Sequence, residues 1–370
     1  MTALAAARPV ADAPIRETVL VFPAGLPAAQ AWRDQARAAG KRVIGASSLA
    51  FDPAAPSYDD WAFLPYVHDE SFAGAFADLV AERGVAAVYA PHEVVSGVLT
   101  ELLPRLPTAV RLIEPHHMLR AEDVYRDHMA KARAAAARAW FGLEGGSAPL
   151  TPLERAGLVR LVDTIPGMTD HDKLDALVEV MRHAPSGDVV EIGSWWGRSA
   201  ALLLLLSRRY GVGPVLCVDP WRKENLDQGV AVLDKASARM DVDQALEIFQ
   251  INLSPLAQGD LNYIRAPSAE AAPRYGAGVT VATEAFGETR YGGQIALLHI
   301  DGNHAYEAVE ADARLWTPHV KPGGWIVFDD YVWAFGDGPR RVGDAWLAAN
   351  AARIDLSFVI GTALFVRLSA

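Results

Sequence analysis

The 370-residue chain alternates short apolar runs with longer stretches of helical period. Short apolar runs bounded by turn residues are typical of buried strands, whereas apolar positions three and four apart indicate amphipathic helices. In the first part of the chain this order predicts a small α/β domain with a parallel sheet. Its expected strands are 18–22, 42–46, 86–90 and 111–113, and its expected helices are 28–39 and 72–83.

The same alternation begins again after residue 189. A helical stretch over 152–183 leads into expected strands at 189–191, 214–218, 261–265, 295–300 and 325–328. Two final apolar runs, 356–360 and 363–367, flank Gly361 and predict a closing hairpin, so the last strand should be antiparallel to an otherwise parallel sheet. The fold class is therefore α/β, with a doubly wound, mostly parallel C-terminal sheet preceded by a smaller Rossmann-like α/β domain.

An Ala/Arg-rich helix over 121–140 and a Gly/Ser/Pro-containing linker over 142–149 separate the two patterns. The predicted organisation is a flexible tail over 1–16, an N-terminal α/β auxiliary domain with its connecting helix over 17–145, and a second domain over 146–370.

Composition narrows the range of functions. A net charge of −11 argues against a nucleic-acid partner, because there is no basic stripe to neutralise phosphates. The single cysteine, Cys217, lies in an apolar run and is expected to be an inert core residue. The first residues lack a secretory signal pattern, and the leucine run 202–206 is too short to span a membrane. We expect a cytoplasmic protein that binds neither nucleic acid nor membrane and forms a homo-oligomer.

Acidic residues follow two neighbouring strands of the second domain. Asp301 closes the run 295–300, and Asp329 and Asp330 close the run 325–328, with a helical segment between them. A strand–helix–strand crossover makes the strands parallel, so their carboxyl ends meet at one edge of the sheet. Three carboxylates with His304 nearby are the layout of a hard-metal site with a base beside it. The alternative for Asp329 and Asp330 is a solvated turn cap, and His304 could simply begin a helix.

A glycine-containing loop opens the second domain, in the sequence VVEIGSWWGRSA over 189–200. An apolar run ends at Glu191, then Gly193 and Gly197 flank a tight turn before a helix. Glycines there permit close backbone approach to a ligand, and the helix start offers free amides. The loop lacks the third glycine of the dinucleotide fingerprint, which favours a nucleoside without a pyrophosphate over NAD. Glycines kept only for packing remain the alternative.

Further candidate nucleoside contacts follow the next strands. Asp219 stands where a carboxylate holds a ribose diol, although it could cap the turn before Pro220. Ser268 could contact an adenine or cap the following helix, and the two alternatives are equal. The loop contributes Ser194, Trp195 and Ser199 as candidate contacts. For Trp195, Trp196 and Trp221 packing is an equal or better alternative.

The segments VVEIGSWWGRSA, CVDPW and IDGNHAYEAVEADARLWTPHVKPGGWIVFDDY, with a looser match at GPRRVGDAW, carry a resemblance that spans residues 189–346. The second domain resembles class I S-adenosylmethionine-dependent methyltransferases. It is most similar to the metal-dependent macrocin-type O-methyltransferases that modify sugars on macrolides, and to the related cephalosporin-hydroxylase-like group.

The resemblance implies a seven-stranded sheet, bound S-adenosylmethionine, and Mg²⁺ or another divalent metal held by Asp301, Asp329 and Asp330. His304 would be the general base that deprotonates an alcohol. Some relatives have Glu where this chain has Asp329, and the shorter side chain alters the distance to a metal. The cofactor contacts expected from these motifs are Glu191, Gly193, Ser194, Trp195, Gly197, Ser199, Asp219 and Ser268.

The expected activity is therefore O-methylation of a small molecule, a sugar or glycoside. Catechols stay open as acceptors because vicinal hydroxyls of either class bind a metal. A hydroxylase or other non-methyl-transferring enzyme and a catalytically inactive cofactor-binding scaffold are the alternatives. The first domain is similar to the small Rossmann-like domain that precedes ATP-grasp domains, and a structural, oligomerising or substrate-covering role is expected for it. Acceptor specificity is expected from loops 280–293 and 333–339.

Overall fold

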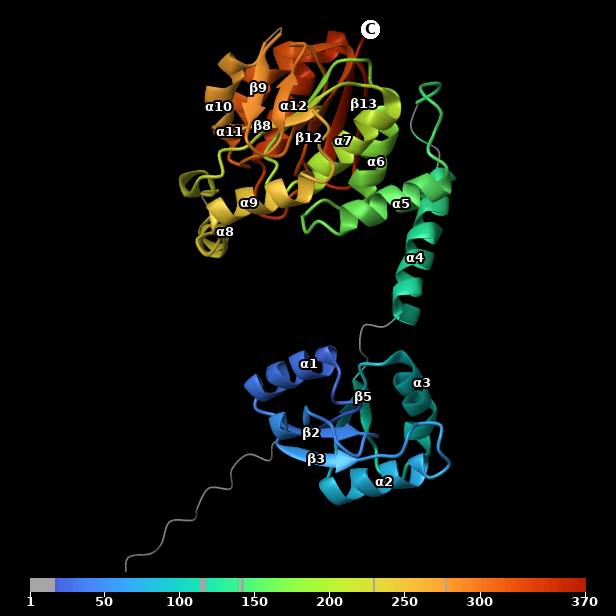
Figure 1. Ribbon diagram of the computed structural model, residues 1–370. Helices are drawn as coiled ribbons and strands as arrows, with labels where there is room; N and C mark the ends of the chain where they lie inside the picture. Colours follow the sequence, from blue (N-terminus) through green and yellow to red (C-terminus); the bar gives the residue numbers. More distant parts are fainter. Residues whose placement is uncertain (1–16, 114–117, 139, 141–142, 229, 277) are drawn as a thin grey trace, which may run out of the picture. The chain divides into compact units, whose positions relative to one another are not determined.

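The computed structural model describes residues 17–113, 118–138, 140, 143–228, 230–276 and 278–370 (Figure 1). The chain divides into two compact units, Met1–Arg126 and Asp127–Ala370. This division falls inside helix α4 (Met118–Ala136), upstream of the linker predicted from composition. The predicted flexible tail over 1–16 lies outside the described residues.

The first unit is built on a five-stranded parallel sheet in the order β3-β2-β1-β4-β5. Its strands and helices are β1 (Thr18–Val21), α1 (Pro27–Ala38), β2 (Arg42–Ser47), β3 (Asp60–Phe63), α2 (Phe72–Arg83), β4 (Ala87–Tyr89), α3 (Glu93–Leu102) and β5 (Arg111–Ile113). Apolar residues of α1 pack on one face of the sheet, and those of α2 and α3 pack on the other. The prediction of a small parallel α/β domain is confirmed. The sequence interpretation missed β3 and α3.

The second unit contains a seven-stranded sheet in the order β13-β14-β12-β11-β6-β7-β8. Its strands are β6 (Asp188–Ile192), β7 (Val215–Val218), β8 (Leu261–Ile264), β11 (Ile295–Ile300), β12 (Val320–Phe328), β13 (Ile354–Ile360) and β14 (Ala363–Leu368). Only β14 runs against its neighbours, pairing antiparallel with both β12 and β13. The predicted α/β class, the seven strands and the antiparallel last strand are all confirmed.

Helices cover both faces of this sheet. One face carries α5 (Pro152–Asp163), α6 (His171–Arg182), α7 (Arg198–Tyr210) and α9 (Val242–Leu253), and the other carries α10 (Ser268–Ala271), α11 (Tyr306–Trp316) and α12 (Gly338–Asn350). Side chains alternate between the faces along each strand, because successive Cβ atoms point in opposite directions. In β11, Leu297 joins the core under α6 and α7, while Leu298 joins the core under α11. The same alternation determines on which face of the sheet a side chain at the end of a strand lies.

Local details differ from the sequence predictions. The stretch expected to be one helix over 152–183 is two helices, because the segment between them contains Pro166 and Gly167 and cannot continue a helix. The segment 321–324, which contains Pro322 and two glycines, lies inside β12 as an irregularity, where the register against β11 shifts between the pairs Ile295–Val320 and Leu297–Trp325. A short helix, α8 (Ala231–Ser237), and a hairpin of β9 (Thr280–Thr283) and β10 (Gly287–Arg290) were not predicted. Among the described residues, no helix is both long enough and apolar enough to cross a membrane.

Candidate active site

A cavity of about 590 Å³ opens at the C-terminal edge of the seven-stranded sheet. Its wall is formed by the loops that follow β6, β7, β8, β11 and β12 and by the segment preceding α6. Ligands bind at this edge in open α/β sheets. Ten of the predicted site residues line it: Gly193, Ser194, Trp195, Ser199, Asp219, Ser268, Asp301, His304, Asp329 and Asp330. Glu191 and Gly197, which were predicted to contact the cofactor, do not belong to this lining.

Both loop glycines are required by the packing of the protein itself. Gly193 has a φ of +82°, and a Cβ there would lie 2.0 Å from the carbonyl oxygen of Asp301. Gly197 has a φ of +88°, and its Cβ would lie 3.0 Å from the ring of Phe249. The close approach of the β6 loop to the end of β11 therefore accounts for Gly193 without a ligand. A role of either glycine in binding a cofactor stays a prediction.

Asp219 organises the glycine loop. Its Oδ2 accepts hydrogen bonds from the backbone amides of Ser194 and Trp195, both at 3.0 Å, and its Oδ1 accepts one from the amide of Trp221 at 2.8 Å. Burial raises the pKa of this carboxyl group, and these amide donors partly offset the rise. The turn-capping alternative for Asp219 is thus present in the structure, and ribose binding stays a prediction for a residue that also lines the cavity.

The tryptophans near the loop are largely packed. Trp221 is 1% exposed, its ring centroid lies 4.9 Å from that of Phe249, and its Nε1–H donates to the carbonyl of Trp195 at 3.0 Å. Core packing, the favoured alternative, therefore describes Trp221. The rings of Trp195 and Trp196 stack with centroids 6.0 Å apart.

Backbone strain also gathers at this cavity. Among the described residues, the non-glycine residues with left-handed backbone are Trp195, Trp221 and Asp330, with φ of 44°, 40° and 49°. All three line the cavity. Such conformations cost about 1–3 kcal/mol each and cluster at functional sites.

Ser268 does not cap the helix that it begins, since Pro267 is the N-cap residue of α10. Its hydroxyl oxygen instead accepts a hydrogen bond from Nε1 of Trp316 at 2.7 Å. Beside it in the cavity wall lies Asp312, which is 6% exposed. Burial raises the pKa of Asp312 from 3.8 to about 6, and a hydrogen bond with Ser268 opposes the rise. A buried carboxyl group at a cavity wall is suited to a ligand that donates hydrogen bonds.

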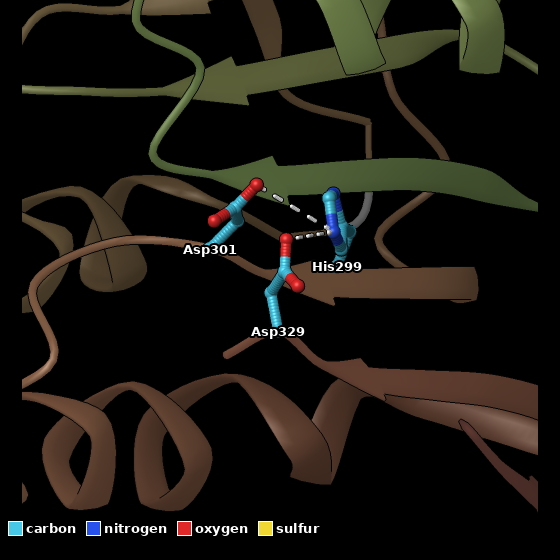
Figure 2. Close-up of side chains that lie close together, drawn as sticks. All are labelled: His299, Asp301 and Asp329. Atoms are coloured by element: carbon cyan, nitrogen blue, oxygen red, sulfur yellow. Dashed lines mark ion pairs between the residues drawn. The ribbon is translucent and has the colours of Figure 1, made fainter. Parts of the chain in front are cut away.

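Side chains at the ends of β11 and β12 form two groups that share Asp301, and the ligand atoms of each group lie close enough together to hold a metal ion. The first consists of His299, Asp301 and Asp329, and the second of Asp301, His304 and Asp330. Figure 2 shows the first group, with Nε2 of His299 lying 3.6 Å from Oδ2 of Asp329 and 3.8 Å from Oδ2 of Asp301. His299 stands opposite Val327 in the register of β11 and β12, so Asp301 and Asp329, two positions further on, continue the sheet face under α6, whereas the left-handed backbone of Asp330 turns its side chain away.

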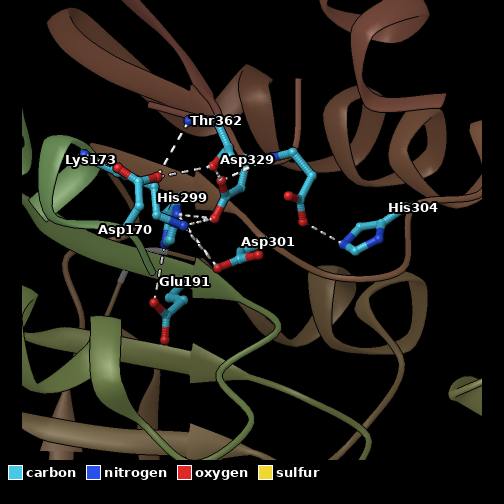
Figure 3. A network of polar contacts seen from close by, with 9 residues as sticks. Asp170, Lys173, Glu191, His299, Asp301, His304, Asp329 and Thr362 are labelled. Carbon is cyan, nitrogen blue, oxygen red and sulfur yellow. Dashed lines mark hydrogen bonds and ion pairs between the residues drawn. The ribbon is translucent and has the colours of Figure 1, made fainter. Parts of the chain in front are cut away.

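A lysine from α6 enters the first group. Lys173 is 2% exposed, and its Nζ contacts Oδ2 of Asp329 and lies 3.8 Å from Oδ2 of Asp301 (Figure 3). Burial opposes the charge of this ammonium, but the carboxylates of Asp301 and Asp329 raise its pKa. Burial would raise the pKa of Asp329, yet Lys173 and His299 hold it well below its ordinary value. Burial and the charge of Asp329 raise the pKa of Asp301 well above its ordinary value.

Glu191 extends this group beneath the sheet edge. It stands beside His299 in the register of β6 and β11, and its Oε1 lies 3.1 Å from Nδ1 of His299. Both residues are 0% exposed. Burial lowers the pKa of His299, but hydrogen bonds with Asp329 and Glu191 raise it to about 10. Glu191 was predicted to contact the cofactor; in the structure it faces His299, because it lies within the strand.

The second group faces the cavity. Nε2 of His304 lies 2.9 Å from Oδ2 of Asp330, and the backbone amide of His304 donates to Oε1 of Gln228 at 2.9 Å. The indole of Trp333 meets the His304 ring edge to face, with centroids 4.4 Å apart. Nδ1 of His304 has no hydrogen-bond partner among the described residues. A histidine oriented by a carboxylate, with its other nitrogen unpaired, is an arrangement suited to accepting a proton.

The predicted site of three carboxylates does not fit a divalent metal as these side chains stand. Mg²⁺ binds oxygen ligands at about 2.0–2.1 Å and repels a neighbouring ammonium. The oxygen of Asp329 that faces Asp301 is already in contact with Lys173. Its other oxygen accepts from the amide of Asp330 at 2.8 Å and from the Thr362 hydroxyl at 3.1 Å. The metal assignment therefore stays a prediction.

Three functional candidates were missed from the sequence: Lys173, His299 and Asp312. A signal existed for His299, because a histidine within the apolar run of β11 had to find a buried partner. Lys173 and Asp312 lie at ordinary positions of amphipathic helices, where charged residues are common.

Part of the second unit is similar to known proteins. Residues 190–331 match the family described as "Methyltransferase domain". No curated protein matches the chain. Among solved structures, the O-methyltransferase NovP is 16% identical, with 68% of this chain and 99% of NovP covered and a TM-score of 0.41.

Two further structures have the same level of similarity. CalS11, a TDP-rhamnose 3'-O-methyltransferase of calicheamicin biosynthesis, is 15% identical over 68% of this chain and 96% of its own, with a TM-score of 0.36. MycE methyltransferase from the mycinamycin biosynthetic pathway, in complex with Mg, SAH and mycinamycin VI, is 16% identical over 59% of this chain and 56% of its own, also with a TM-score of 0.36. The match over residues 190–331 bears out the prediction that the chain is a methyltransferase enzyme.

Proposed function

We propose that this methyltransferase domain binds S-adenosylmethionine in the cavity and methylates a hydroxyl group of a small molecule, a sugar or glycoside. The observation that carries the proposal is the placement of two chemically different walls around one cavity. One wall holds the glycine loop, Asp219 and the Ser268–Asp312 pair, and the other holds His304 paired with Asp330.

The first wall has groups that suit S-adenosylmethionine. Ser194 and Trp195 of the glycine loop line the cavity, where their backbone is held by Asp219. Asp219 stands at the end of β7, where its carboxylate can accept from ribose hydroxyls. Asp312 and Ser268 can accept hydrogen bonds from the amino group of an adenine. When bound, S-adenosylmethionine supplies an electrophilic methyl group whose departure leaves a neutral thioether.

The second wall has the residues for activating a hydroxyl. The Asp330 carboxylate accepts from Nε2–H of His304, and this tautomer leaves the lone pair of Nδ1 free. The imidazole of His304 then removes the proton of the acceptor hydroxyl, while the acceptor oxygen forms the new C–O bond. Asp330 stabilises the imidazolium that results, and the proton passes from His304 to water after the product leaves.

The acceptor is expected to lie between His304 and the segment after β12. Trp333 and Phe335 line the cavity there, and aromatic rings pack well against the apolar faces of sugar rings. The other loop that was expected to give specificity, 280–293, contributes no residue to the lining described for this cavity.

The test starts with isothermal titration of the full chain with S-adenosylmethionine, once with Mg²⁺ and once with EDTA. Binding with a micromolar Kd is expected, and an absence of binding in both conditions would refute the proposed function. Glycosides and catechols are then offered as separate acceptor panels, with methyl transfer followed by mass spectrometry. Methylation of catechols alone would refute the assignment of a sugar acceptor.

The base is tested with His304→Ala. Its kcat should fall by about 10²–10⁴-fold, with cofactor affinity nearly unchanged. His319→Ala is the matched control, because His319 packs against Tyr275 outside the cavity lining and should be replaceable with little loss of activity. Equal activity of the His304→Ala enzyme and the wild type would exclude His304 as the base.

A further inference from the structure

Lys173 brings an ammonium group into the place where the sequence predicted a metal. It is the third residue of α6, and its backbone amide donates to the N-cap carboxylate of Asp170 at 2.8 Å. From this first helical turn the side chain reaches the edge of the sheet, where Nζ contacts Asp329 and approaches Asp301 (Figure 3). A lysine that is 2% exposed is found in proteins only where opposite charges compensate its burial.

The contacts of Asp329 leave little room for another cation. One oxygen contacts Lys173 and lies 3.6 Å from Nε2 of His299, and the other accepts from the Asp330 amide and the Thr362 hydroxyl. The amide of Thr362 is itself 3.4 Å from Oδ2 of Asp170, the residue that caps α6. The closed network from Asp170 through Lys173, Asp329 and Thr362 ties the start of α6 to the ends of β12 and β13.

We propose that the Lys173 ammonium takes the place of a divalent metal between Asp301 and Asp329, and that His304 and Asp330 pair with each other and not with a metal, so that this active site works without bound metal. The part of this inference that concerns methyl transfer rests on the proposed function; the part that concerns cation binding does not. Unlike a metal ion, the ammonium group of Lys173 cannot coordinate the hydroxyl groups of a substrate. Proton removal therefore falls to His304 and Asp330.

Lys173 is a positioning residue in this scheme. It fixes the carboxylate of Asp329, which accepts from the backbone amide of Asp330 at 2.8 Å. Asp330 in turn holds His304 through the 2.9 Å contact between Oδ2 and Nε2. The charge of Lys173 thus sets the position of the base through two intermediate residues, without touching the acceptor.

The experiment measures Mn²⁺ binding by electron paramagnetic resonance and calorimetry in the wild type, Lys173→Met and Lys321→Met, all as the full chain. Lys321 is the matched control, because it lies on β12 at the opposite end from Asp329 and donates to the carbonyl of Ser186 at 2.7 Å. The wild type and Lys321→Met should bind no Mn²⁺ at micromolar concentrations. Lys173→Met should bind one ion at least about 100-fold more tightly, since two buried carboxylates lose their counter-charge.

The uncompensated carboxylates could prevent Lys173→Met from folding, so thermal melting is followed with and without Mn²⁺. A Tm that rises with Mn²⁺ in this variant alone supports the inference. The double variant Lys173→Met/Asp329→Asn removes both charges and should fold but bind no Mn²⁺. A folded Lys173→Met that gains no Mn²⁺ affinity, or a wild type that binds one Mn²⁺ in competition with Mg²⁺, overturns the inference.

Activity separates this inference from the proposed function. Once an acceptor is found, wild-type turnover should be the same in EDTA and in Mg²⁺. Turnover that stops in EDTA and returns with Mg²⁺ overturns metal independence while leaving the methyltransferase assignment intact. Failure to bind S-adenosylmethionine would refute the proposed function, and the Mn²⁺ measurements would still decide the role of Lys173.

Discussion

Asp312 allows the strongest quantitative prediction. Its carboxyl group is 6% exposed, and burial raises its pKa from 3.8 to about 6. A group that binds its proton more tightly in the folded state loses stability as the pH rises from below 3.8 to above 6. The difference from 3.8 to about 6 corresponds to about 3 kcal/mol, which the folded unit loses once Asp312 is ionised above pH 6.

Asp312→Asn removes this cost while keeping the size of the side chain. The variant should be more stable than the wild type by about 1–3 kcal/mol at pH 8 and by about 1 kcal/mol less at pH 5, where the wild-type group is largely protonated. Glu307→Gln is the matched control, because Glu307 is exposed on the same helix. It should change stability by less than about 0.5 kcal/mol at both pH values.

The measurement must report the second unit, since the chain has two compact units that need not unfold together. Hydrogen exchange of the amides of β11 and β12, followed by mass spectrometry in increasing urea, gives the free energy of opening for that sheet. A stabilisation that is independent of pH would refute the reasoning, because it would come from something other than ionisation. A destabilised variant at pH 8 would show that the carboxylate has a favourable partner.

The same substitution tests the proposed contact with adenine. If ionised Asp312 accepts from the amino group, Asp312→Asn should weaken S-adenosylmethionine binding about tenfold at pH 8, because a charge-assisted hydrogen bond becomes a neutral one. The wild-type affinity should then rise as the pH passes through about 6. Calorimetry at pH 5, 6, 7 and 8 measures both effects, and an affinity that does not depend on residue 312 would contradict the contact.

Three other substitutions test the framework of the site. Gly193→Ala should destabilise the second unit by more than about 3 kcal/mol, because its Cβ would lie 2.0 Å from the Asp301 carbonyl oxygen. Gly211→Ala is the control: its Cβ would meet nothing within 4 Å, so only its φ of +67° should cost stability, about 1–2 kcal/mol. Equal losses of stability in urea denaturation would show that the left-handed backbone, and not the contact with Asp301, sets the cost at Gly193. Arg155→Met should cost about 2–4 kcal/mol, since it leaves the half-buried Asp175 without its cation and buried Glu179 with only Arg182, and a change below about 1 kcal/mol would contradict that pairing. Asp188→Ala should cost about 2–4 kcal/mol by removing the acceptor for the Tyr275 hydroxyl and the amides of Gly292 and Gly293; an unchanged urea midpoint would contradict this.

The fold could be predicted from the sequence because its signals are local. The run over 295–300 and the helix over 72–83 match the observed β11 and α2, since apolar period and turn residues mark both of their ends. The convergence of Asp301, Asp329 and Asp330 also followed, because the crossover between β11 and β12 makes those strands parallel neighbours. Elements with weak apolar pattern were lost: the exposed strands β9 and β10 carry Thr, Glu and Arg, which give no clear period.

The electrostatic character of the site could not be predicted in the same way. Lys173 and Asp329 are 156 residues apart in the chain, and the pattern of α6 does not tell which strand end its first turn will cover. Only packing decides this, because α6 lies on the face of the sheet that odd-numbered residues of β11 occupy. A cluster of carboxylates read from a sequence therefore predicts that a cation will be present, while leaving its identity open between a metal and an ammonium.

The backbone at Asp330 explains how two adjacent aspartates come to serve different purposes. Asp329 directly follows the last residue of β12 and keeps its inward direction, so its side chain enters the group under α6. Asp330 has a left-handed backbone, with a φ of 49°, and its side chain meets His304 at the cavity. Aspartate tolerates this conformation better than most residues. The amide of Asp330 donates to Asp329, so the turn itself depends on the charge that Lys173 holds in place. The buried ion pair thereby supports the conformation that presents the base, which is a reason for a protein to keep a charged group where an apolar one would be cheaper to bury.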